Sequence, residues 1–274
     1  MSESTRTPPV ENTVRRVISV NGTEIVLEQV THGPNNLVLL SGGPTRRTSW
    51  APAAALLDGR FSCWLMDRRG KGDSGDTAPY SFDREYDDLA AVAASFDQPI
   101  SMGGHSSGAL CVLGAALRGV PAAPLILYEP PWPLDDDHTP VTVVEAIEAQ
   151  IAAGNRDHAL DIAFLELVGM PPAAIEAIRP SPFWGEFRAL VHTWPREMRE
   201  IAGGAWDTTP LTAITTPTLL LDGALSHPRS RRSTAAIAAA LPSSQVTELP
   251  GQGHGALRAA PDLIAAAIHK YAQT

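Results

Sequence analysis

A G-x-S-x-G pentapeptide at residues 104–108 constrains the fold of this chain more than any other feature. It lies between a short β-like run and an apolar helical run, so Ser106 is expected on a tight strand-to-helix turn that lifts its hydroxyl clear of a sheet. Gly104 and Gly108 suit this turn because a Cβ at either position would collide with the neighbouring strand and helix. The pentapeptide alone is weak evidence, and its context decides between a nucleophile and an ordinary turn.

Strand-like and helix-like segments alternate over most of the chain. A hairpin is predicted around Asn21-Gly22, with flanking strands at 17–20 and 24–30. Further strands are predicted at residues 37–41, 61–66, 99–103, 124–129, 216–222 and 245–249. Helices are predicted at 49–57, 82–96, 109–117, 231–240 and 261–271. Strands that alternate with helices form mainly parallel sheets, so the expected fold class is α/β, with a mainly parallel central sheet and helices on both faces.

The alternation stops between about residue 131 and residue 207. This stretch contains helical runs at 143–153 and 159–168, four of the six tryptophans and no convincing strand. We therefore predict a polar leader at 1–13, a core made of 14–130 and 207–274, and a helical cap inserted at 131–206. Insertions at the carboxyl ends of strands lie where open α/β sheets bind ligands, so this cap is expected to border the site.

The net charge of the chain bears on which molecules it can bind. A net charge of −9 gives no basic surface for nucleic acid or for an anionic membrane, so a neutral or cationic small-molecule substrate fits more easily. That argument concerns the whole molecule and leaves room for a local basic pocket. No apolar stretch reaches the roughly 18 residues that span a bilayer, and the first residues lack a signal-peptide pattern, so the expected location is cytoplasmic. Nothing in the sequence defines an oligomeric state.

A serine is a poor nucleophile unless a neighbouring base takes its proton. The best-placed base is His254, which lies in a Gly-rich loop after the last predicted strand and before the last predicted helix. Attack on a carbonyl also needs donors for the developing oxyanion. The Ser41-Gly-Gly-Pro44 loop follows a predicted strand, and we expect the amides of Gly43 and Ser107 to form the oxyanion hole.

These segments resemble the α/β-hydrolase fold superfamily over roughly residues 14–272. Four pieces match in order: the Gly-Gly-Pro loop, the D-R-R-G-K-G-D-S turn at 67–74, the G-x-S-x-G turn at 104–108 (the elbow), and the strand, loop and helix around His254. The chain is also similar to bacterial, often actinobacterial, hydrolases that carry D-R-R-G-x-G-D-S-G-D, G-H-S-S-G and Y-E-P-P segments. In that fold the 67–74 turn is architectural, and the resemblance gives it no catalytic role.

The acid of the expected catalytic triad is the open question. The superfamily usually places an aspartate about four residues beyond the strand at 216–222, and here Ser226 occupies that position. Two carboxylates could substitute. Glu129 ends a strand just before Pro130, as the triad acid does in some lipases of this fold, whereas Asp222 lies on the usual strand but four residues early. Glu129 is the favoured candidate, and Asp222 or no acid at all are the alternatives.

The first hypothesis is a serine hydrolase that acts on a carboxylic ester, lactone or thioester of a small apolar substrate through an acyl-enzyme. Ser106 attacks, His254 moves the proton, and Glu129 orients the imidazole. The alternatives are a non-hydrolytic lyase or cyclase and a catalytically silent ligand receptor on the same scaffold. This mechanism implies no metal or organic cofactor. The Asp135-Asp-Asp-His138 segment suggests a metal site, but three successive aspartates cannot easily point at one ion, so a solvated loop is favoured there. Arg46-Arg47 lies beside the expected oxyanion loop, where it could meet an anionic substrate, but a pair of surface arginines at a helix start is the favoured interpretation.

Overall fold

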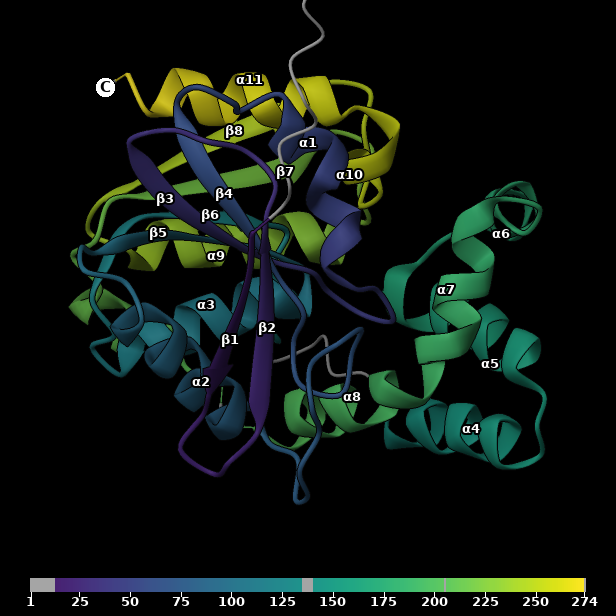
Figure 1. Cartoon of the computed structure of the whole chain (residues 1–274). Helices are drawn as coiled ribbons and strands as arrows, with labels where there is room; N and C mark the ends of the chain where they lie inside the picture. Colours follow the sequence, from purple (N-terminus) through teal and green to yellow (C-terminus); the bar gives the residue numbers. More distant parts are fainter. Residues whose placement is uncertain (1–12, 135–139, 205, 274) are drawn as a thin grey trace, which may run out of the picture.

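The computed structural model describes residues 13–134, 140–204 and 206–273, and these contain one eight-stranded sheet (Figure 1). Its strands lie in the order β1-β2-β4-β3-β5-β6-β7-β8. Their bounds are β1 (Thr13–Ile18), β2 (Glu24–Gln29), β3 (Asn35–Leu40), β4 (Phe61–Met66), β5 (Ile100–His105), β6 (Ala122–Tyr128), β7 (Thr218–Gly223) and β8 (Ser244–Leu249). The β1–β2 and β2–β4 pairs are antiparallel, and every other pair is parallel. The predicted mainly parallel α/β class is therefore confirmed.

Helices cover both faces of this sheet. On one face lie α1 (Ala51–Ala55), α10 (Ala256–Ala259) and α11 (Pro261–Tyr271), and on the other lie α2 (Phe82–Ala94), α3 (Ser107–Leu117) and α9 (Pro228–Ala240) (Figure 1). Alternate side chains of β3 join two separate apolar clusters, since Leu39 packs with the α1 and α11 side and Leu40 with the α2 and α3 side. Strands buried on both faces explain why their sequences read as continuous apolar runs.

A helical segment connects β6 to β7. It contains α4 (Val141–Ala152), α5 (Arg156–Ile162), a π-helical turn (Ala163–Val168), α6 (Pro172–Ile178), α7 (Pro182–Leu190) and α8 (Trp194–Gly203). These helices lie beside the sheet rather than over either face (Figure 1). In the described part of 131–206 there is no strand, as expected, whereas the core-and-cap division itself stays a prediction.

Two sequence predictions fall outside the described residues: the polar leader, apart from Thr13, and the Asp135–His138 loop. The helix expected at 49–57 is split into a 3-10 turn (Arg47–Trp50) and α1, because Pro52 lies inside it. None of the helices in the described ranges combines the length and apolar character needed to cross a membrane.

Candidate active site

Ser106 occupies a strained turn between β5 and α3. Its backbone has φ 54° and ψ −128°, a conformation that non-glycine residues rarely adopt. The Ser106 N–H donates a hydrogen bond to the Tyr128 carbonyl at the end of β6, at 2.9 Å. Backbone strain of this kind persists only where the surrounding structure enforces it, and here it holds Ser106 at the end of the sheet.

Close packing around this turn requires the two elbow glycines. A Cβ at Gly104 would lie 2.5 Å from the carbonyl carbon of Gly108, and a Cβ at Gly108 would lie 2.6 Å from the Ser41 carbonyl oxygen. Both distances are far below any van der Waals contact, and both obstacles are backbone atoms that cannot rotate away. Steric exclusion by these backbone atoms therefore explains why the pentapeptide has glycine at both positions.

His254 and Glu129 meet although 125 positions separate them in the chain. The Nδ1 atom of His254 lies 2.6 Å from Oε2 of Glu129, whose side chain is fully buried. Burial by itself raises the pKa of the Glu129 carboxyl, but hydrogen bonds from His254, Ser226 and the Gly223 amide outweigh it and hold that pKa below the usual value. Glu129 is therefore an ionised acceptor that fixes which nitrogen of His254 carries a proton.

Three donors on the β7 side hold the Glu129 carboxylate in place. The Gly223 amide donates to Oε1 at 2.8 Å, the Ser226 hydroxyl donates to the same oxygen, and the Ser230 hydroxyl donates to Oε2 at 3.2 Å. Ser226 stands where the superfamily usually carries its acid, and it contacts the carboxylate that comes from the neighbouring strand. Sequence reasoning missed this role of Ser226.

Asp222, the alternative acid, points elsewhere. Its Oδ2 atom accepts from Arg231 at 3.4 Å, and within the described ranges no contact joins it to His254. Burial and the nearby Glu129 charge raise the pKa of Asp222 above its usual value. The geometry thus brings Glu129, rather than Asp222, to the imidazole.

His105 and Tyr128 support the loop that carries His254. The Nε2 atom of His105 bonds to the His254 carbonyl oxygen at 3.0 Å, and the two imidazole rings lie 4.5 Å apart. The Tyr128 hydroxyl donates to the Gly253 carbonyl and accepts from the Ala256 amide at 3.2 Å. Burial lowers the pKa of His105 well below its usual value, so this ring stays neutral. Sequence reasoning did not single out either residue.

Gly43 and Ser107, whose amides are the predicted oxyanion donors, are in contact through the Ser107 side chain. The Gly43 amide donates to the hydroxyl of Ser107 at 3.1 Å. Ser107 is the first residue of α3, where backbone amides have no partner inside the helix. The indole of Trp194 lies beside Gly43, since a Cβ at that glycine would be 3.4 Å from the ring. The Gly43 amide therefore already has an acceptor in this structure.

A buried charge cluster, made of Arg68, Lys71, Glu85 and Glu197, lies beneath these donors. Lys71 bonds to the Gly43 carbonyl and to Glu197 at 2.7 Å, while Arg68 donates to the Ser107 hydroxyl and to Glu197, both at 3.0 Å. Burial raises the pKa of Glu197, but the two cations outweigh it and bring the value to about 2. Burial and the Arg68 charge lower the pKa of Lys71 to about 8.

The 67–74 turn, expected to be architectural, therefore contacts both the Gly43 loop and the start of α3. The charged residues of this segment are typical of a surface turn, and no signal in the sequence indicated that Arg68 and Lys71 are buried. Arg46 is exposed and pairs with Glu186, as expected of a surface arginine. Arg47 is not a surface residue: its side chain is only 14% exposed and pairs with Glu28, with Asp73 and with the fully buried Asp67.

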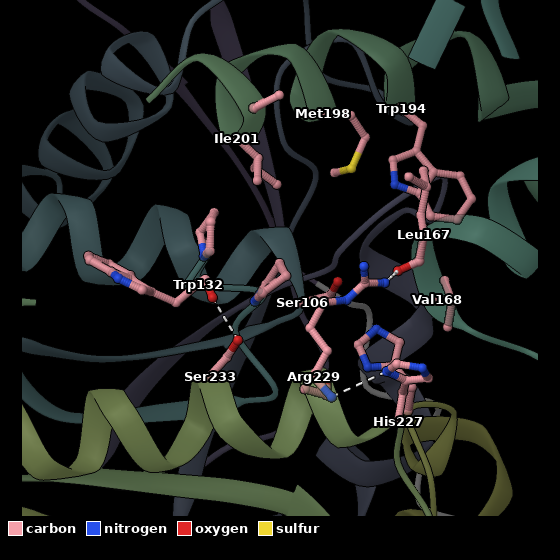
Figure 2. Close-up of a pocket in the computed structure, with 15 residues that line it drawn as sticks. Ser106, Trp132, Leu167, Val168, Trp194, Met198, Ile201, His227, Arg229 and Ser233 are labelled. Carbon is pink, nitrogen blue, oxygen red and sulfur yellow. Dashed lines mark hydrogen bonds between the residues drawn. The ribbon is translucent and has the colours of Figure 1, made fainter. Parts of the chain in front are cut away.

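Two cavities meet at Ser106 and His254. The larger has a volume of about 420 Å³ and is lined on its apolar side by Phe164, Phe187 and Trp194. The smaller has a volume of about 80 Å³ and lies between α8 and α9, with Trp132 in its wall (Figure 2). Tryptophans of the helical segment thus face the site. Across the described ranges, no cluster of His, Cys, Asp and Glu side chains is arranged to hold a metal ion.

Comparison with known proteins identifies the family and the fold. The sequence model of the alpha/beta hydrolase family matches residues 37–267. An alpha/beta hydrolase from Sphaerobacter thermophilus is 34% identical over 94% of this chain and 99% of its own, with a TM-score of 0.85.

Two esterases of known structure share the fold at lower identity. One from Thermogutta terrifontis is 23% identical over 95% of this chain and 98% of its own, with a TM-score of 0.69. One from Rhodococcus is 21% identical over the same two shares, with a TM-score of 0.70. No curated protein matches the sequence. Because the family match spans most of the length, this chain belongs to the alpha/beta hydrolase family.

Proposed function

We propose that this protein is a serine hydrolase that cleaves a carboxylic ester, lactone or thioester through an acyl-enzyme. The observation that carries the proposal is the 2.6 Å contact between His254 Nδ1 and the buried Glu129 carboxylate, beside the strained turn of Ser106. With Nδ1 donating to Glu129, the Nε2 atom of His254 is left as the base. Ser106 attacks the carbonyl, His254 takes its proton and returns it to the leaving group, and water releases the acyl group.

The oxyanion is held by the amides of Gly43 and Ser107. In the structure the Gly43 amide donates to the Ser107 hydroxyl at 3.1 Å, and the substrate's carbonyl oxygen takes over as its acceptor. Ser107 keeps its other partners, because its hydroxyl also donates to Glu197. One acceptor replaces another, which requires the Gly43 amide to turn from the Ser107 hydroxyl toward the substrate.

The helical segment 131–206 acts as the cap that selects the substrate. It supplies Phe164, Phe187 and Trp194 to the larger cavity and Trp132 and Met198 to the smaller one. Aromatic and aliphatic walls favour an apolar group, because burial of its surface is the main source of binding energy. A small molecule with at least one bulky apolar part fits these walls.

The absence of an acid at position 226 is the sequence feature that motivates the lyase and cyclase alternative, because such chemistry can use the pocket and His254 without an acyl-enzyme. The contact of Glu129 with His254 removes that motive, since a carboxylate reaches the imidazole from the neighbouring strand. No other observation favours a non-hydrolytic reaction or a silent receptor over the hydrolase.

A fluorophosphonate probe tests the proposal. We expect rapid labelling of the wild-type protein at neutral pH, mapped by mass spectrometry to Ser106, and none in Ser106→Ala or His254→Ala. Ser101→Ala is a matched control, because this serine is buried in β5, the strand that leads into the elbow. Failure of the folded wild-type protein to react, or labelling of a different serine, would overturn the assignment.

A further inference from the structure

The smaller cavity contains an arginine beside the proposed nucleophile. Arg229 lies in the first turn of α9 and shares the cavity wall with Ser106 and His254. Its guanidinium donates to the backbone carbonyls of Leu167 at 2.9 Å and Glu166 at 3.4 Å. Figure 2 shows the side chain rising from α9 through the cavity toward Leu167. These two carbonyls orient the guanidinium without neutralising its charge.

The charge of Arg229 has no protein counter-ion in the described part of the chain. Among the described residues, no carboxylate side chain lines the smaller cavity, and Arg229 is its only permanently charged wall residue. Other arginines near the site differ in this respect. Arg258, in the larger cavity, pairs with Glu186 at 3.2 Å and stacks on Phe183 at 4.2 Å. Arg231, two residues further along α9, pairs with Asp222 and Glu248.

A partly buried guanidinium with open donors favours a planar anion. Arginine binds a carboxylate through two parallel N–H donors, and the positive end of a helix such as α9 adds to the attraction. The cavity volume of about 80 Å³ has room for a few water molecules, which is the space that a carboxylate on a short chain needs. The overall charge of −9 disfavours anions at long range, but a local, partly dehydrated cation outweighs it at contact distance.

We propose that the substrate carries a carboxylate a few atoms from its scissile bond, bound by Arg229 in the smaller cavity, while its apolar part occupies the larger one. The proposal rests on the hydrolase function proposed above. It makes Arg229 a specificity-determining residue, and it places the reacting carbonyl at Ser106, where the two cavities meet.

Two matched pairs of esters test this. The first pair is 4-nitrophenyl hydrogen succinate and its methyl ester, with the carboxylate in the acyl part. The second pair is the phenylacetate ester of glycolic acid and its methyl ester, with the carboxylate in the alcohol part. We expect wild type to favour the acid of one pair, which identifies the side that enters the smaller cavity. Arg229→Gln should lower that acid-to-neutral ratio of kcat/KM by about 10- to 100-fold, mostly through KM.

Arg231→Gln is the matched control, because it removes the same charge from the same helix outside the cavity, and its ratio should equal that of wild type. The proposal is wrong if wild type favours neither acid, or if Arg229→Gln leaves the ratio unchanged. Binding of 4-nitrophenyl hydrogen succinate and of the glycolate ester to Ser106→Ala, with and without Arg229→Gln, is measured calorimetrically. If wild type hydrolyses none of the four esters but the acids bind in an Arg229-dependent way, only the hydrolase function is contradicted. If the acids bind equally well with and without Arg229→Gln, the carboxylate site is contradicted.

Discussion

Glu129→Gln is the sharpest perturbation of the site, because it keeps the shape of the side chain and removes its charge. The amide can still accept from Ser226, but it no longer offers an anion to His254, and it favours the wrong imidazole tautomer. Two unit charges about 4 Å apart attract by about 4 kcal/mol at an effective dielectric constant near 20. At 1.36 kcal/mol per factor of ten, the expected loss in kcat is about 10³-fold, near the 10⁴-fold known for a triad aspartate changed to asparagine.

The assay is steady-state hydrolysis of a neutral aryl ester, with the concentration of folded enzyme fixed by circular dichroism and thermal melting. Asp222→Asn is the matched control: it removes a carboxylate of the same sheet edge that pairs with Arg231 and not with His254, so kcat should stay within about threefold. If Glu129→Gln keeps more than about one tenth of kcat, or if Asp222→Asn loses as much as Glu129→Gln, the electrostatic reasoning is refuted.

Three further predictions concern the acid, the oxyanion loop and the charge cluster. Adding Ser226→Asp to Glu129→Gln should recover about tenfold or more in kcat, because position 226 already reaches the same carboxylate site; no recovery in a folded double variant contradicts this. In Gly42→Ala the new Cβ would lie 2.6 Å from the Cβ of Ser106, so kcat should fall about tenfold or more, whereas Gly185→Ala, with open space around it, should leave kcat unchanged in the same assay. The pKa of Glu197 is about 2 in the folded chain, against 4.5 for an unperturbed glutamate, so the stability from its ionisation is full above pH 4.5 and is lost as pH falls toward 2. Between roughly pH 5 and pH 3, the free energy of unfolding measured in urea should therefore fall by about 2 kcal/mol more for wild type than for Glu197→Gln. An equal fall in both proteins would contradict this prediction.

Local patterns in the sequence predicted most of the fold. The alternation of apolar runs and helical periodicity indicated the parallel strands and their covering helices, because both signals depend on residues close together in the chain. Helices α6, α7 and α8 were not predicted individually, since each is short and begins near a proline. In addition, α6 has only two turns, and α7 and α8 mix aromatic with charged residues. Their form depends on packing against the rest of the molecule.

The candidate site was predictable only in part, for a related reason. The elbow and the histidine loop are marked by glycines at fixed spacing, and the structure brings Ser106, Glu129 and His254 to one edge of the sheet. The choice between Glu129 and Asp222 depends on how the ends of β6 and β7 are directed, which spacing along the chain does not define. Lys71 shows the same limit, because a charged residue in a turn is expected at the surface and here it is 1% exposed.

The buried charge cluster also determines which part of the helical segment can move. Glu197 of α8 pairs with Arg68 and Lys71, and Arg68 also pairs with Glu85. Pulling α8 from the core would therefore take from buried Lys71 its carboxylate partner, at a cost of several kcal/mol. Arg196, its neighbour, adds a second attachment through Asp76 at 2.6 Å. By contrast, α7 is held to the core by ion pairs of Glu186 with arginines that are partly exposed. Helix α8 is thus the firmly held edge of the segment, whereas α7, whose Phe183 and Phe187 line the larger cavity, is tied to the core by ion pairs that solvent screens.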